Sequence, residues 1–194
     1  NMNYNKAFFE KAFGIFSQLP ASDSNEIVFA GKSNVGKSSL LNKIFSRKSL
    51  ARVSSVPGKT ITINFYDVDG VKFVDLPGYG YAKISKQEKL RFAELTEGFF
   101  HSDRNIKLVV ILVDIRHSPS KDDLNMIDFV KQMNLPFIIA LTKSDKLNKT
   151  EYKNRMSLVT DELGVDDSIV VIPFSSKTGQ GVEEVKKCIE NSIS

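Results

Sequence analysis

A run of glycine, lysine and serine residues early in the chain has the composition needed to bind phosphate. Gly31-Lys-Ser-Asn-Val-Gly36-Lys37-Ser38 fits the pattern G-x-x-x-x-G-K-[ST] and lies between the apolar run Ile27–Ala30 and the helical pattern of Ser38–Phe45. The glycines let the backbone curl so that its N–H groups point inward, and the helix N-terminus adds partial positive charge. We therefore expect Lys37 to contact the β- and γ-phosphates of a nucleotide and the Ser38 hydroxyl to bind Mg²⁺.

A second candidate group follows the apolar run Val71–Val74. Asp75-Leu76-Pro77-Gly78 places a carboxylate at the end of a predicted strand. We expect Asp75 to face the same phosphate pocket and to bind Mg²⁺, through a water, and Gly78 to bring its N–H to the γ-phosphate. An Asp followed by Pro-Gly is by itself more often a simple turn, so this interpretation depends on the phosphate loop that precedes it.

Two further motifs could read a base. Thr142-Lys143-Ser144-Asp145 follows the apolar run Phe137–Leu141, and Ser175-Ser176-Lys177 follows the run Ile169–Ile172. A carboxylate at Asp145 can accept the N1–H and 2-amino hydrogens of guanine, which adenine does not donate, and a buried site of this kind rejects the wrong base by about 10⁴. Lys143 can lay its aliphatic stem across the base. A backbone N–H of the Ser175 segment could contact guanine O6, and this is the weakest of the four signals.

The elements that must position these motifs alternate along the chain. Strands separated by helices predict a mainly parallel sheet covered on both faces, and Asp69-Gly70 predicts a hairpin that makes one strand antiparallel. We expect six strands in one α/β domain over residues 23–194, after an extension at residues 1–22 that holds a short helix with apolar residues at Ala7, Phe8, Ala12 and Phe16. The other predicted helices cover residues 38–45, residues from about 121, residues 149–163 and the C-terminal stretch that contains Val182, Val185 and Ile189.

Composition and charge exclude several classes of protein. The 194 residues include one cysteine, Cys188, which excludes a disulfide framework and a cysteine-rich zinc site. The apolar run Leu108–Val113 is too short to span a membrane, and a single cysteine suits a reducing compartment, so we expect a cytoplasmic protein. We also expect a monomer. The net charge is +4, but no acidic residue occurs between Ile27 and Tyr66. We call residues 27–66 the acid-free segment, and its seven basic residues could face a polyanion such as RNA; they are Lys32, Lys37, Lys43, Arg47, Lys48, Arg52 and Lys59.

The order and detail of these motifs resemble one family. Gly31-Lys-Ser-Asn-Val-Gly-Lys-Ser-Ser-Leu40, Pro57-Gly-Lys-Thr60 and Asp75-Leu-Pro-Gly-Tyr-Gly-Tyr-Ala82 resemble the EngB family (also called YihA or YsxC) of small bacterial GTPases, one of the TrmE-Era-EngA-EngB-septin-like P-loop GTPases. The resemblance extends from about Phe16 to the C-terminus. It implies a Ras-like P-loop GTPase domain, hydrolysis of GTP to GDP and phosphate, a role in assembly of the large ribosomal subunit through contact with rRNA, and a need for the protein in cell division and septation. Ser175-Ser176-Lys177 departs mildly from the family's S-A-K.

The resemblance also implies residue roles. Thr60 is similar to the threonine that closes on Mg²⁺ and the γ-phosphate, with Thr62 as the rival candidate, and Lys37, Thr60 and Gly78 would carry the catalysis. Ser38, Thr60 and Asp75 would hold Mg²⁺. The residues expected to line the nucleotide are Gly31, Lys32, Ser33, Asn34, Val35, Gly36, Lys37, Ser38, Gly58, Lys59, Thr60, Ile61, Thr62, Asp75, Leu76, Pro77, Gly78, Thr142, Lys143, Ser144, Asp145, Phe174, Ser175 and Ser176.

The position after Gly78 bears on the rate. Many GTPases place a water-orienting Gln there, whereas this chain has Tyr79, so we expect slow intrinsic turnover. Asn34 resembles the Asn with which related GTPases hold K⁺ near the β,γ-bridge, although it could equally be a turn residue. Tyr79 and Tyr81 could be core aromatics, but the glycines around them favour, by a small margin, exposed positions that face a partner. Residues 83–91 resemble a second switch.

Three alternatives remain at this point. A P-loop ATPase or kinase would need no guanine reader, and Asp145 argues against it. An interaction module that binds nucleotide with little turnover is disfavoured by the intact Lys37, Ser38 and Asp75. A Ras-like membrane switch would need a lipidation motif, and neither end of the sequence has one.

Overall fold

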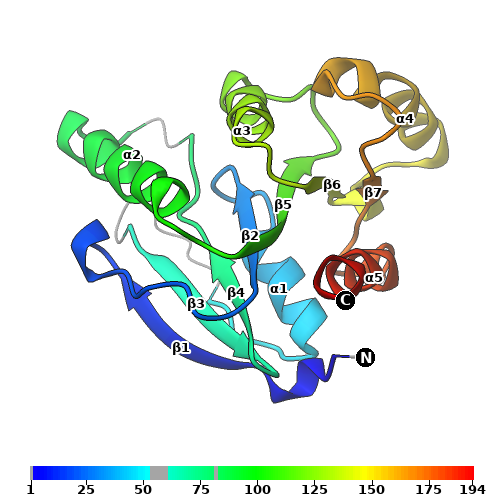
Figure 1. Ribbon diagram of the computed structural model, residues 1–194. Coiled ribbons are helices and arrows are strands. Elements are labelled where there is room, and N and C mark those ends of the chain that lie inside the picture. The colour runs from blue at the N-terminus through cyan, green and yellow to red at the C-terminus, as the bar shows by residue number, and fades with distance from the viewer. Residues whose placement is uncertain (1, 53–60, 81–82) are drawn as a thin grey trace.

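The computed structural model describes residues 2–52, 61–80 and 83–194, and its seven strands form one sheet in the order β1-β3-β4-β2-β5-β6-β7 (Figure 1). Strand β3 is antiparallel to its neighbours β1 and β4, and the other neighbouring strands are parallel. The predicted α/β class is confirmed, with seven strands in place of six. The strands are β1 (Phe8–Phe13), β2 (Glu26–Gly31), β3 (Ile63–Val68), β4 (Val71–Asp75), β5 (Ile106–Asp114), β6 (Phe137–Thr142) and β7 (Val171–Pro173).

The additional strand is β1, and it corrects the helix predicted near the N-terminus. Residues Phe8–Phe13 pair with β3, and only the short 3₁₀ turns Tyr4–Lys6 and Phe16–Gln18 flank them. Two aromatic contacts cross this edge of the sheet: Phe9 lies against Tyr66 at 5.6 Å between ring centroids, and Phe13 lies against Phe65 at 5.5 Å. Such cross-strand pairs outweigh a weak helical spacing.

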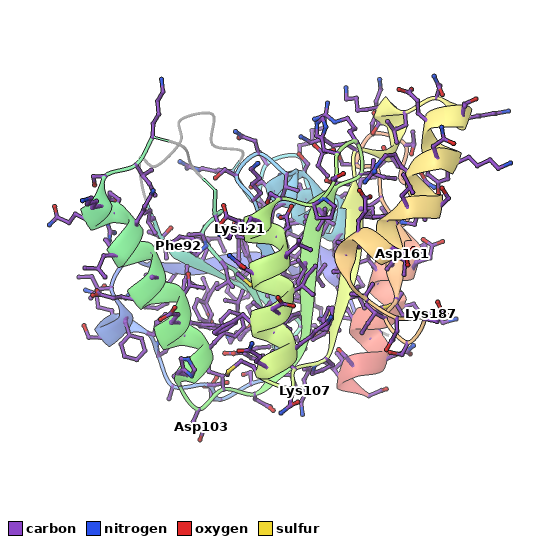
Figure 2. The ribbon with its side chains drawn as sticks, turned by 90° about the horizontal axis from the view of Figure 1, so that it is seen from above. Phe92, Asp103, Lys107, Lys121, Asp161 and Lys187 are labelled. Atoms are coloured by element: carbon purple, nitrogen blue, oxygen red, sulfur yellow. The ribbon has the colours of Figure 1, made fainter. Side chains whose placement is uncertain are left out.

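Each face of the sheet has its own layer of helices (Figure 1). Helices α1 (Lys37–Phe45) and α5 (Val182–Ile193) pack on one face, where Phe29, Phe73 and Val110 point. Helices α2 (Lys86–His101), α3 (Lys121–Gln132) and α4 (Lys149–Leu163) lie side by side over the other face, as Figure 2 shows. Parallel strands buried on both faces read as continuous apolar runs, which explains why β2, β5 and β6 were recognisable in the sequence.

Helix α2 was not predicted. Its signals are nevertheless present, because the Ser85 hydroxyl accepts a hydrogen bond from the Glu88 N–H at 3.1 Å and caps the first turn. Leu95, Phe99 and Phe100 form its buried side. Residues 83–91 resemble a switch segment in the sequence, and this interpretation took the place of a helix over the same residues.

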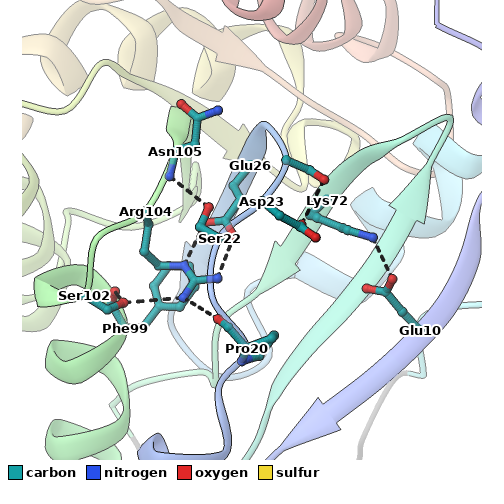
Figure 3. A network of polar contacts seen from close by, with 11 residues as sticks. Glu10, Pro20, Ser22, Asp23, Glu26, Lys72, Phe99, Ser102, Arg104 and Asn105 are labelled. Atoms are coloured by element: carbon teal, nitrogen blue, oxygen red, sulfur yellow. Dashed lines mark hydrogen bonds and ion pairs between the residues drawn. The ribbon is translucent and has the colours of Figure 1, made fainter.

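A buried ion pair secures the end of the sheet where β2 begins (Figure 3). Arg104, before β5, donates to both carboxylate oxygens of Glu26 at 2.9 and 2.7 Å, and to the carbonyl of Pro20 at 3.1 Å. The two charged side chains are 3% and 1% exposed. The guanidinium also lies 4.6 Å from the ring centroid of Phe99 on α2. The contacts therefore join β2, the segment before it and α2.

Candidate functional site

The phosphate loop connects β2 to α1 with the geometry that its sequence predicts. Gly36 has a φ of 104° and Asn34 a φ of 64°, both in the left-handed region. A Cβ on Gly31 would lie 2.8 Å from Val35 Cγ1, so a side chain there would collide with the loop. Gly36 is the N-cap of α1 and provides no side chain to accept from the first N–H groups of the helix. These N–H groups suit an anion such as phosphate.

The register of the sheet brings Asp75 beside this loop. Asp75 pairs with Phe29 across β4 and β2, two residues before Gly31. Asp75 is 5% exposed, and its carboxylate forms an ion pair with the Lys37 ammonium. Its second oxygen accepts a 3.5 Å hydrogen bond from the Asn64 side chain on β3. The sequence thus indicated Asp75 and Lys37 correctly as neighbours, whereas Asn64 was missed because it occupies an ordinary alternating position in a strand.

Two oxygens in this pocket are of the kind that Mg²⁺ prefers. Ser38 Oγ donates to the carbonyl of Arg52 at 2.9 Å, and Asp75 offers a carboxylate. A hydroxyl and a carboxylate are hard oxygen ligands and suit Mg²⁺ without a larger acidic cluster. Thr60, expected as the third ligand, lies outside the described residues together with Gly58 and Lys59.

Most of the expected phosphate-side residues line one pocket. The pocket is also lined by Ser39, Arg52 and Asn64, which were not among the expected site residues. Of these three, Arg52 is one of the basic residues of the acid-free segment. Gly31 is the last residue of β2 and directly precedes the residues that line the pocket. The expected residues that line it are Lys32, Ser33, Asn34, Val35, Gly36, Lys37, Ser38, Ile61, Thr62, Asp75, Leu76, Pro77 and Gly78.

The segment after Asp75 lies directly on the phosphate loop. A Cβ on Gly78 would approach the Ser33 Cα to 3.1 Å, so a side chain here would crowd the backbone of the phosphate loop. The Ser33 N–H donates to the Tyr79 carbonyl at 2.8 Å, and the Tyr79 N–H donates to the Gly31 carbonyl at 3.2 Å. The side chain of Tyr79 is 7% exposed, which corrects the expectation of an exposed, partner-facing tyrosine. Tyr81 lies outside the described residues.

The Thr142–Asp145 motif supports the phosphate loop from its other side. The Thr142 hydroxyl donates to the Val35 carbonyl at 2.6 Å, and the Lys143 ammonium donates to the Asn34 carbonyl at 2.8 Å. Lys143 also lies 3.4 Å from a carboxylate oxygen of Asp114. Burial alone would raise the pKa of Asp114, but hydrogen bonds from Arg116 and the charge of Lys143 outweigh it and hold that pKa below its usual value. Asp114 therefore stays ionised and keeps the lysine in place.

The Ser175–Lys177 motif positions the Thr142–Asp145 motif. The Ser175 hydroxyl, which is fully buried, donates to an Asp145 carboxylate oxygen at 2.8 Å and itself accepts from the N–H groups of Lys177 and Thr178. The sequence predicted only a backbone role for this segment. Ser144 donates from its hydroxyl to the Gln180 side chain at 2.6 Å and from its N–H to the Phe174 carbonyl. The two loops thus form one unit.

Phe174 and Ser176 complete this unit in different ways. The side chain of Phe174 is buried in the core, so only its backbone can face a ligand, whereas Ser176 is exposed. Because β2, β4, β5, β6 and β7 are parallel, all four motifs leave the sheet at the same edge. Ligands of open α/β sheets bind at this edge.

No helix of the described residues has the length and apolar character needed to cross a membrane.

Comparison with known proteins agrees with this geometry. A family model described as a 50S ribosome-binding GTPase matches residues 26–143, and one described as the elongation factor Tu GTP-binding domain matches residues 93–194. The "Probable GTP-binding protein EngB" of Bacillus mycoides strain KBAB4 and that of Bacillus cereus strain G9842 are each 46% identical over 173 residues, which is 89% of this chain and 87% of theirs.

Solved structures show the same architecture. The crystal structure of a probable GTP-binding protein EngB matches with a TM-score of 0.71 and 26% identity over 87% of this chain and 98% of that one. Aquifex aeolicus Era bound to GDP and AlF₄⁻ matches in fold with a TM-score of 0.68 and 20% identity, over 87% of this chain and 57% of that one. The four motifs at this edge of the sheet are therefore those of a P-loop GTPase. The chain belongs to the EngB family of GTP-binding proteins.

Proposed function

We propose that this GTPase is a nucleotide-dependent switch that binds the large ribosomal subunit during its assembly, and that cell division and septation depend on it through this role. The observation that carries the proposal is the family match over residues 26–143, whose description is a 50S ribosome-binding GTPase. Assembly of ribosomal subunits makes the cytoplasm its place of action. The basic residues of the acid-free segment supply a surface suited to rRNA phosphates.

The exposure and hydrogen bonds of these basic residues indicate which of them are available to contact rRNA. Lys32, Lys43, Lys48 and Arg52 are exposed. The Arg47 guanidinium donates to the carbonyls of Asn5 and Ala7, so part of its hydrogen-bonding capacity is used within the protein. Lys59 lies outside the described residues. Lys43 and Lys48, at the end of α1 and just after it, are therefore the sharpest candidates for phosphate contacts.

In the proposed reaction, water attacks the γ-phosphorus of GTP in line with the β,γ-bridging oxygen. The bond to that oxygen breaks, GDP carries away the developing negative charge, and the proton of the water passes to the released phosphate. Lys37 exchanges its Asp75 partner for the phosphates, and the N–H groups of the loop and of α1 stabilise the charge. Mg²⁺, when bound, neutralises charge shared by the β- and γ-phosphates, and Ser38, Thr60 and Asp75 would hold it.

Slow intrinsic turnover is part of the proposal. The position that holds a water-orienting Gln in many GTPases is Tyr79, and its hydroxyl is bound to Asp123 on α3 at 2.6 Å. The side chain is therefore committed to the protein interior. Gly78 remains to contact the γ-phosphate through its N–H.

Co-sedimentation with purified ribosomal subunits tests the proposed role. We expect the protein to sediment with the large subunit in the presence of a non-hydrolysable GTP analogue and to be largely released with GDP. Equal binding in the two states, or none in either, would contradict the switch. Lys43→Glu with Lys48→Glu should weaken binding and reduce its salt dependence, whereas Lys149→Glu with Lys153→Glu, the same charge change on two exposed positions of α4, should leave both unchanged.

We further propose that K⁺ binds near the side chain of Asn34 and accelerates hydrolysis. Asn34 is exposed, lines the phosphate pocket and has a φ of 64°. Asn34→Gly removes the side-chain oxygen and retains a residue suited to this backbone conformation. Hydrolysis by the unchanged protein should be several-fold faster in KCl than in NaCl at equal ionic strength, and the variant should lose this difference. Equal rates of the unchanged protein in the two salts would refute the K⁺ site.

A further inference from the structure

Tyr79 connects the loop that carries Gly78 to a different layer of the protein. Its hydroxyl donates to Asp123 Oδ1 at 2.6 Å, and the two residues are 7% and 5% exposed. Burial, and then the neighbouring Asp123 carboxylate, raise the pKa of Tyr79 far above its usual range. The phenol is therefore protonated at any physiological pH and remains a hydrogen-bond donor.

The acceptor is itself firmly placed. Asp123 is the third residue of α3, and its other carboxylate oxygen accepts from the N–H of Ser120 at 3.0 Å, while its N–H donates to the Ser120 hydroxyl at 3.1 Å. This capping box fixes the first turn of α3. Ile127 and Val130 anchor the same helix in the core. Asp123 is thus a rigid point to which the Gly78 loop can be tied.

The Tyr79–Asp123 hydrogen bond acts on the backbone of the adjacent residue, Gly78. Tyr79 follows Gly78 directly, and its backbone exchanges hydrogen bonds with Gly31 and Ser33 of the phosphate loop. The main chain of Gly78 is consequently held from two directions, by the phosphate loop through the backbone and by α3 through the phenol. A peptide unit held in this way has few other positions available.

We propose that Tyr79 is a positioning residue for the γ-phosphate, because its bond to Asp123 holds Gly78 where the Gly78 N–H meets that phosphate group. The inference rests on the proposed contact between Gly78 and the γ-phosphate. GDP has no γ-phosphate, so the bond supports binding of GTP and not of GDP. Tyr79 therefore contributes to the discrimination between the two nucleotides on which a switch depends.

Tyr79→Phe removes the hydroxyl, and with it the hydrogen bond to Asp123, and keeps the ring. Tyr79 lines a groove between α2 and α3 together with Phe92, which Figure 2 labels on α2, and Met126, and phenylalanine keeps that packing. If loss of the bond leaves the loop correctly placed about one tenth of the time, the apparent affinity for GTP falls about tenfold. We expect this loss for a non-hydrolysable GTP analogue, with GDP affinity unchanged within about twofold, both measured by calorimetry in Mg²⁺ buffer.

Two further variants make the result interpretable. Tyr4→Phe removes another buried phenol that donates to a carboxylate, Glu190 on α5, and should change neither affinity. Gly78→Ala places a Cβ against Ser33 and should lower affinity for the GTP analogue at least as much as Tyr79→Phe does. Thermal unfolding of all three variants, measured without nucleotide, separates any general loss of stability from the effect on binding.

The possible failures are distinct. If Gly78→Ala weakens the GTP analogue selectively but Tyr79→Phe lowers both affinities equally, changes neither or strengthens the analogue, then the positioning role of Tyr79 is wrong and the Gly78 contact stands. If Gly78→Ala itself does not distinguish the two nucleotides, then the proposed Gly78 contact is wrong and this inference falls with it.

Discussion

Replacing Asp145 by Asn should lower the affinity for GTP at least about 10³-fold and create affinity for xanthosine triphosphate. The Asp145 carboxylate is held by the buried Ser175 hydroxyl at 2.8 Å, which leaves the other oxygen and the remaining lone pairs for a base. A carboxylate accepts both the N1–H and the 2-amino hydrogens of guanine. An amide accepts the N1–H of xanthine and donates to its 2-oxo group, so the preference reverses.

Calorimetric titration with GTP, ATP and xanthosine triphosphate measures this change. The matched control is Asp166→Asn, the same substitution in the loop after α4, where, among the residues that the structure describes, the carboxylate accepts only from Ser168 in its own turn. It should bind GTP as the unchanged protein does. Unaltered GTP binding by Asp145→Asn would refute the base-reading role, and retained preference for ATP over GTP in the unchanged protein would favour an ATPase or kinase.

Replacing Arg104 by Ala should lower the free energy of unfolding by about 3–5 kcal/mol, because it leaves the buried Glu26 carboxylate without its partner. Glu26 is 1% exposed, and both of its oxygens accept from Arg104. Natural domains are stable by about 5–15 kcal/mol, so this single change removes a large share of the total. Urea unfolding followed by circular dichroism measures it.

Two controls separate the buried charge from other effects. Lys6→Ala removes an exposed ion pair with Asp69, whose ends are 3.6 Å apart, and should cost less than about 1 kcal/mol. Arg104→Met combined with Glu26→Gln removes both charges and should recover a large part of the stability lost in Arg104→Ala. A loss below about 1 kcal/mol in Arg104→Ala would show that the pair contributes little.

The prediction of the fold was most accurate where a pattern is local. The strands β2, β5 and β6 are apolar runs because parallel strands are buried on both faces, and the predicted helix over 149–163 has the bounds found for α4. Strand β1 was mistaken for a helix because five of its six residues are exposed and show no alternation. Its identity comes from pairing with β3, which lies about 50 residues away in the chain.

The prediction of the site divides in the same way. Residue types and spacing assigned Lys37 and Asp75 to one phosphate pocket, and the structure places them in contact there. The positions of Tyr79 and Ser175 could not be obtained in this way. Whether a tyrosine between glycines faces solvent or a buried carboxylate depends on helix α3, more than 40 residues further along the chain.

The sequence by itself determined the class of this protein, because the phosphate loop, the carboxylate after β4 and the guanine-type motif each require particular residues at fixed local spacing. Local spacing specifies what a loop can bind, since the backbone of a few residues forms most of such a site. Only the tertiary structure decided how the loops support one another: Thr142 and Lys143 on the phosphate loop, Ser175 on Asp145, and Tyr79 on Asp123. These bonds join residues between 30 and 109 positions apart. Their existence depends on the order of strands in the sheet, which no local pattern encodes.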